Sequence, residues 1–190
     1  MNFDMDTYNK AESKEFGEYE KLEPGGHIVK IVSAEEYTSP VTEKTSLKVC
    51  VDTASGDSQP GFFQKIYDAD TNKDKKWPNG GVKYLSLAND QLGFLKGFIT
   101  ALEKSNKFTF NLKGNWEQLK GLTCAAQFGQ EEYEKQDKTI GVATKLIGFR
   151  SLSKLSEIKV PAIKKLEPQP TSDMLKDYED VVEIDDNFLD

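Results

Sequence analysis

The chain of 190 residues carries 25 basic and 32 acidic side chains, a net charge of −7, and 37% of its residues are hydrophobic. This length and composition are typical of one folded domain with extensions and exclude wholesale disorder. No apolar run approaches the ~20 residues that span a bilayer, and the acidic first residues lack the features of a signal peptide. We therefore expect a cytoplasmic protein with no membrane partner.

The negative charge is concentrated near the C-terminus. Residues 171–190 contain eight acidic residues and one basic residue, whereas residues 24–166 contain 21 basic and 16 acidic residues. We divide the chain into a polar, flexible N-terminal arm (1–23), a mildly basic binding domain (24–166), and a Pro-containing linker with an acidic tail (167–190). A polyanion is compatible with the central domain in spite of the overall charge.

Hydrophobic periodicity predicts five strands and one principal helix. Leu47, Val49 and Val51 alternate with polar or small residues, which predicts a half-buried strand. Apolar residues recur every three or four positions over 89–105, which predicts a helix that Asn89 could cap. The predicted strands are residues 27–32, 46–52, 61–67, 122–128 and 139–149.

The predicted order is three strands, one helix and two strands (β-β-β-α-β-β). This is the order of the OB-fold, a small, partly open five-stranded barrel whose strand 2–3 face and loops bind oligonucleotides or oligosaccharides. Other five-stranded barrels and sandwiches have compatible patterns. We predict a mainly β, OB-fold-like barrel between the N-terminal arm and the acidic tail.

Catalytic residues of the usual kinds are scarce. His27 is the only histidine, so a nucleophile paired with a histidine base is not expected. One histidine and two distant cysteines, Cys50 and Cys124, cannot supply a zinc site. Both cysteines lie in strand-like apolar runs, where we expect them reduced and buried.

One loop contains three aspartates that could suggest a metal site. Asp68, Asp70 and Asp74 lie close together, as in carboxylate Mg²⁺ sites. The loop lacks the Gly and the closing Glu of an EF-hand, and neighbouring lysines would compete for the carboxylates. A metal-dependent nuclease is therefore a minor alternative. We expect no enzyme activity, no cofactor and no bound metal.

Aromatic and basic residues gather on the predicted binding face. Single-stranded nucleic acid is bound by aromatic rings that stack on bases and by cations that follow the phosphates. The predicted nucleic-acid-binding residues are Lys48, Phe63, Lys65, Tyr67, Lys73, Lys75, Lys76, Trp77, Lys145, Phe149 and Arg150. The competing interpretation is that Phe63, Tyr67 and Phe149 belong to the core and that the lysines only solubilise strand edges.

The acidic tail contains hydrophobic side chains that a merely solubilising segment would not need, which is typical of peptides that dock on a partner. The predicted partner-binding residues are Asp185, Asp186, Phe188 and Leu189. The sequence of residues 185–188 resembles the acidic, Phe-bearing C-terminal peptides of bacterial and bacteriophage single-stranded DNA-binding proteins. That resemblance implies recruitment of replication, recombination and repair proteins and competition with DNA for the OB-fold. Here two residues follow Phe188, whereas Phe is the last residue of the bacterial peptides.

Residues 22–166 are similar to phage replication-module proteins of Gram-positive hosts, which are suspected of binding single-stranded DNA. The similar stretches are residues 22–27, 92–102 and 150–166. The resemblance implies a phage-type single-stranded DNA-binding protein acting in DNA replication or recombination in the host cytoplasm. The alternative is a protein-interaction module, such as a host-factor inhibitor or DNA mimic, with its acidic ends on a basic partner. A homo-oligomer is compatible with both.

Overall fold

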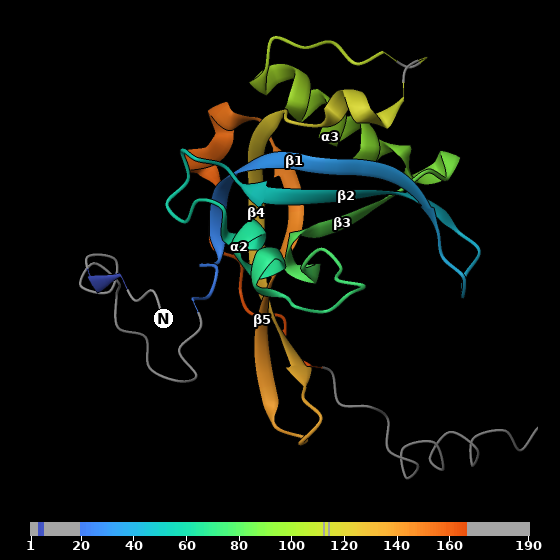
Figure 1. The fold of residues 1–190 in the computed structure, drawn as a ribbon. Helices are drawn as coiled ribbons and strands as arrows, with labels where there is room; N and C mark the ends of the chain where they lie inside the picture. Colours follow the sequence, from blue (N-terminus) through green and yellow to red (C-terminus); the bar gives the residue numbers. More distant parts are fainter. Residues whose placement is uncertain (1–3, 6–19, 112, 114, 167–190) are drawn as a thin grey trace, which may run out of the picture.

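The computed structural model describes residues 4–5, 20–111, 113 and 115–166, and within them five antiparallel strands form one open sheet (Figure 1). The strand order is β3-β2-β1-β4-β5. The strands are β1 (Gly25–Thr38), β2 (Thr45–Thr53), β3 (Val82–Ser86), β4 (Thr123–Glu134) and β5 (Ile140–Arg150). The prediction of a mainly β protein is confirmed, and four of the five strands lie where the sequence predicts them.

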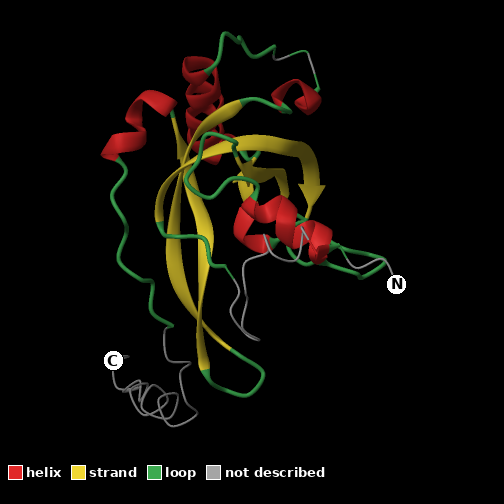
Figure 2. Cartoon of the chain, turned by 60° about the vertical axis from the view of Figure 1, so that its left-hand side comes forward, coloured by secondary structure: helices red, strands yellow, loops and turns green. Residues whose placement is uncertain are grey.

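The principal helix, α3 (Leu92–Ser105), lies between β3 and β4 in the chain and covers one end of the sheet (Figure 2). It begins three residues later than predicted because Asn89–Gln91 form a separate 3-10 helix, η2. Asn89 therefore does not cap α3. Three further 3-10 helices are described: η1 (Asn79–Gly81), η3 (Trp116–Leu119) and η4 (Leu152–Glu157). None of the described helices has the length and apolarity needed to cross a membrane.

Two irregularities in strand pairing curl the sheet. The register of β1 against β2 shifts between Ile31 and Ser33, and that of β4 against β5 shifts between Gln127 and Phe128. An extra residue on one strand bends it and increases its twist. β1 pairs with β4 over residues 25–30 and with β2 over residues 29–38, and the edge strands β3 and β5 approach one another.

The core lies on the concave side of the curled sheet. Leu47, Val49 and Val51 are fully buried there, as their alternation predicts. Phe98 of α3 and Phe128 of β4 are the largest of the fully buried side chains. Because protein interiors are closely packed, this cluster fixes the position of α3 against the sheet.

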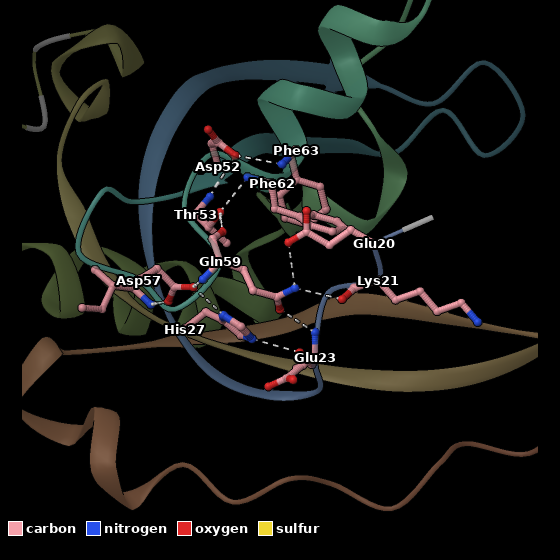
Figure 3. Close-up of polar contacts among 11 residues, drawn as sticks. Glu20, Lys21, Glu23, His27, Asp52, Thr53, Asp57, Gln59, Phe62 and Phe63 are labelled. Atoms are coloured by element: carbon pink, nitrogen blue, oxygen red, sulfur yellow. Dashed lines mark hydrogen bonds and ion pairs between the residues drawn. The ribbon is translucent and has the colours of Figure 1, made fainter. Parts of the chain in front are cut away.

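The strand predicted over residues 61–67 is wrong, because the segment forms the helix α2 (Phe62–Ala69). The preceding residue, Gly61, has a φ of 67° and offers no side-chain cap. The cap comes instead from β2. The carboxylate of Asp52 accepts hydrogen bonds from the backbone N–H groups of Phe63 (2.9 Å) and Gln64 (3.2 Å), and the hydroxyl of Thr53 accepts one from Phe62 (2.9 Å; Figure 3).

A second polar cluster holds the turn before α2 against the start of β1. His27 Nδ1 lies 2.9 Å from Asp57 Oδ1, and His27 Nε2 lies 2.9 Å from the carbonyl oxygen of Glu23 (Figure 3). Asp57 also accepts hydrogen bonds from the backbone N–H groups of Ile28 and Gln59. His27 is therefore a buried structural residue that fixes the turn after β2.

Replacement of Asp52 by Ala should destabilise the fold. The substitution leaves two backbone N–H groups at the start of α2 without their acceptor, and buried unsatisfied donors cost about 1–3 kcal/mol. Urea denaturation should show a lower unfolding free energy for Asp52→Ala by that amount. Asp68→Ala, which removes an exposed carboxylate from the same helix, should change it by less than about 0.5 kcal/mol. Equal stabilities for the two variants would contradict the capping role.

Candidate nucleic-acid interface

A groove of about 620 Å³ lies over the outer face of β1, β2 and β3, beside α2 and the loop that leads to β3. Four aromatic and three basic side chains line it, and no Asp or Glu is among its described lining residues. We call this surface the aromatic–basic groove. Its characteristic residues are Tyr37, Lys48, Tyr67, Lys75, Lys76, Trp77 and Tyr84.

The aromatic residues of the groove form two pairs. The rings of Tyr37 and Tyr84 have centroids 5.3 Å apart and are 38% and 50% exposed, so each presents ring surface to solvent. The rings of Tyr67 and Trp77 are also 5.3 Å apart. Aromatic pairs thus border the groove at both sides: the exposed pair lies on the strands, and the partly buried pair lies on α2 and its following loop.

The Trp77 loop is held in place by hydrogen bonds. Trp77 Nε1 donates to the carbonyl oxygen of Val51 at 3.0 Å, which fixes the indole against the end of β2. Lys75 Nζ lies 4.4 Å from the centroid of the Tyr67 ring and donates to the Tyr67 carbonyl oxygen. A cation over an aromatic face adds attraction beyond packing. The loop therefore presents its lysines beside fixed rings.

Lys48 lies between the two strands that carry the tyrosine pair. In the sheet it is opposite Tyr84 of β3 and Glu35 of β1, and its Nζ donates to Glu35 Oε1 at 2.8 Å. The pKa of Lys48 is raised mainly by this hydrogen bond, so the side chain is cationic at neutral pH. Glu35 partly neutralises it, and an anion in the groove would have to share Lys48 with Glu35.

Five of the predicted binding residues meet in this groove: Lys48, Tyr67, Lys75, Lys76 and Trp77. The prediction for Phe63 is wrong, because the ring is 2% exposed and packs on Phe62 and Phe128. In a strand, Phe63 would share one face with Lys65 and Tyr67. In the helix α2 it instead points into the core. Lys65 is exposed on α2, 4.0 Å from Glu20, and does not line the groove.

The remaining predicted residues lie elsewhere. Lys73 is exposed in the loop beside Asp70 and Asp74. Lys145 on β5 is paired with Glu131. Phe149 and Arg150 were predicted to belong to the same site as the groove residues. In the structure they line a second pocket, between β3, α3 and β5. The tail residues Asp185, Asp186, Phe188 and Leu189 lie outside the described residues.

Two groove residues escaped the sequence prediction, Tyr37 and Tyr84. Tyr37 lies on β1 beyond the bulge, past the end of the strand that hydrophobicity predicts. Tyr84 lies on β3, a strand of five residues in which only Leu85 is buried. The alternation of Val82 and Tyr84 with Lys83 and Leu85 is the signal that could have revealed this strand.

Several side chains that the sequence offers for catalysis or metal binding have structural contacts or are buried in the described part of the chain. Within the described part of the chain, no three His, Cys, Asp or Glu residues form a cluster able to hold a metal. Asp70 accepts hydrogen bonds from Asn72 in its own loop. The prediction for the cysteines is confirmed, since Cys50 and Cys124 are free and buried. Burial raises the pKa of the Cys124 thiol to about 12, which keeps it protonated.

Comparison of the sequence with known family models and with curated proteins finds no match. The chemistry of the groove therefore has to be argued from its own residues. An exposed tyrosine pair, three lysines and the absence of Asp or Glu among the described lining residues are suited to an anionic ligand with flat apolar faces.

Substitutions should separate the core from the groove. Phe63→Ala removes a fully packed ring and should lower the unfolding free energy by about 3–5 kcal/mol. Tyr84→Ala removes a half-exposed ring from a cross-strand pair and should cost less than about 1 kcal/mol. Thermal or urea unfolding measures both. Similar losses for the two variants would mean that Tyr84 is a core residue rather than part of an open binding surface.

Proposed function

We propose that the protein binds single-stranded DNA through the aromatic–basic groove of an OB-fold-type barrel. The fold assignment is supported by the strand order β3-β2-β1-β4-β5, by the position of α3 between β3 and β4, and by the open seam between β3 and β5. OB-folds bind oligonucleotides on the face of strands 2 and 3. The groove lies over that face, and this coincidence is the observation that carries the proposal.

The groove residues suit single strands better than duplexes. The bases of a single strand can unstack from one another and stack on Tyr37, Tyr84 or Trp77. The bases of a duplex are already stacked and paired. Each stacked base contributes about 1–3 kcal/mol and every base has a flat face, so little sequence preference is expected. Lys48, Lys75 and Lys76 supply the cations for the phosphates.

The proposed activity is binding without chemistry, in DNA replication or recombination. Neither histidine nor a carboxylate is among the described lining residues of the groove, and its lysines could contact the phosphates of a polyanion. The protein would cover single strands and keep their bases from pairing. The resemblance of the body and the tail to phage and bacterial single-stranded DNA-binding proteins supports this role.

The acidic tail would regulate this activity and recruit replication or recombination proteins. Residues 171–190 carry a net charge of −7, enough to compete with phosphates for the lysines of the groove. Deletion of residues 171–190 should then tighten binding to single strands. Unchanged or weaker binding would contradict the competition while leaving the groove assignment in place.

A fluorescence-anisotropy titration with a labelled oligothymidine of about five nucleotides tests the proposed function. With three lysine–phosphate contacts at ~0.7 each, the logarithm of the binding constant should fall with a slope of about −2 against the logarithm of salt concentration. Tyr84→Ala should weaken binding about 5- to 150-fold, the equivalent of one lost stacking contact.

The matched control is Tyr133→Ala, which removes an exposed tyrosine from the β4–β5 hairpin, outside the groove. This variant should bind like the wild type. Absence of binding by the wild type at low salt would contradict the proposed function and favour the protein-interaction module. Equal binding by the wild type and Tyr84→Ala would contradict the groove as the interface.

A further inference from the structure

The seam between the two edge strands is closed at one end and open at the other. β3 and β5 are not hydrogen-bonded to each other. Near the start of β3, Gly80 packs so closely on β5 that an added Cβ would lie 2.8 Å from the carbonyl oxygen of Thr144. Toward Ser86 the strands separate, and a pocket of about 570 Å³ opens between β3, α3 and β5. We call it the seam pocket.

The seam pocket has an aromatic floor and an open wall. Phe98 and Phe149 have ring centroids 4.4 Å apart, and Phe94 is 77% exposed at the rim. The wall formed by α3 contains Gly93 and Gly97, where an added Cβ would meet nothing within 4 Å. Glycine inside an exposed helix costs about 1 kcal/mol relative to alanine, so the open wall is kept at the expense of stability.

The charged side chains among the described lining residues of this pocket are both positive. Lys83 and Arg150 line it, and no Asp or Glu is among its described lining residues. A shallow shelf next to it adds Lys104 and Lys154, again without a carboxylate among the described residues that line it. In the described part of the chain none of these four cations forms an ion pair. Burial lowers the pKa of Lys83, and a bound anion would favour its charged form.

The seam pocket and the aromatic–basic groove adjoin at one residue. Tyr84 lines both surfaces, and Phe149 and Arg150 line both the seam pocket and the shelf. A path therefore leads from the Trp77 loop across Tyr84 to the end of α3, and no Asp or Glu is among the described lining residues of the groove, the seam pocket or the shelf. Both aromatic and cationic side chains line it, and single-stranded nucleic acid is bound by these two kinds of residue.

We propose that a bound single strand continues from the groove over Tyr84 into the seam pocket. There a base stacks on Phe94 or Phe149, and the phosphates contact Lys83 and Arg150 before reaching the shelf. This inference rests on the proposed function and extends it, because it makes the ligand a polymer longer than the groove alone accommodates. An acidic peptide with apolar side chains is the rival occupant, and the experiment below separates the two.

The experiment compares a strand that fills only the groove, about five nucleotides, with one of about 15, near the upper site size of a single OB-fold. On the long strand, Phe94→Ala should bind about 5- to 150-fold more weakly than the wild type. Arg150→Ala should reduce the salt slope by about 0.7. On the short strand both variants should match the wild type. Lys120→Ala, an exposed lysine away from the path, should match it at both lengths.

Both altered side chains are exposed, and circular dichroism melting checks that the variants stay folded. If the wild type binds neither strand, the proposed function and this inference both fail. If the wild type binds and both variants match it at each length, only this inference is overturned. Equal losses on the short and the long strand would also overturn it. So would variants that bind DNA normally but lose binding to a synthetic peptide of residues 177–190.

Discussion

The hydrogen bonds that Asp52 and Thr53 accept from the first turn of α2 determine where the candidate interface lies. An isolated helix of eight residues is not stable in water, so α2 depends on these contacts and on the packing of Phe62 and Phe63. α2 carries Tyr67. In the loop that follows α2, Trp77 donates a hydrogen bond to the carbonyl oxygen of Val51 on β2. One side of the groove is therefore built from the end of β2.

The open sheet supplies the other side of the interface. Bulges in β1 and β5 curl the strands toward a barrel, but β3 and β5 stay unpaired, and a sheet edge without a partner exposes backbone groups that attract other chains. Here α3, the close packing of Gly80 and the aromatic floor of the seam limit that exposure. The gap that remains is lined by cations, which suits a polyanion better than another sheet.

Charge is segregated within the folded body as well as along the chain. The groove, seam pocket and shelf have no Asp or Glu among their described lining residues. The β4–β5 hairpin, by contrast, mixes four acidic residues with three lysines: Glu131, Glu132, Glu134, Asp137, Lys135, Lys138 and Lys145. A local field of one sign raises the concentration of an oppositely charged ligand near it. The total charge of −7 therefore says little about what the groove attracts.

The sequence was sufficient where local pattern decides the structure. The alternation of Leu47, Val49 and Val51 predicted β2 and its buried face correctly, and the lysines around Trp77 predicted part of the groove. Prediction from the sequence failed where contacts between residues far apart in the chain determine the secondary structure. The apolar residues at 62, 63, 66 and 67 fit a buried strand or a helix, and the choice is made by Asp52, eleven residues from Phe63.

Tyr84 was missed for a related reason. The alternation in a five-residue strand with one buried side chain is a weak signal, and the place of the strand in the sheet depends on pairing with β2. Tyr37 was missed because β1 continues past a bulge that only pairing with β2 reveals. Both residues line the groove because of strand pairing, which periodicity along a single segment does not encode.

The most direct test of the interface is ultraviolet crosslinking of the full-length protein to an oligothymidine containing 5-iodouracil, with the crosslinked residues identified by mass spectrometry. If the groove binds the strand, crosslinks fall on Tyr37, Tyr67, Trp77 or Tyr84. The chain has a natural control in Trp116 and Phe110, a stacked aromatic pair with centroids 5.6 Å apart that lies outside the groove. Crosslinks confined to that pair or to the β4–β5 hairpin would contradict the groove as the site of binding.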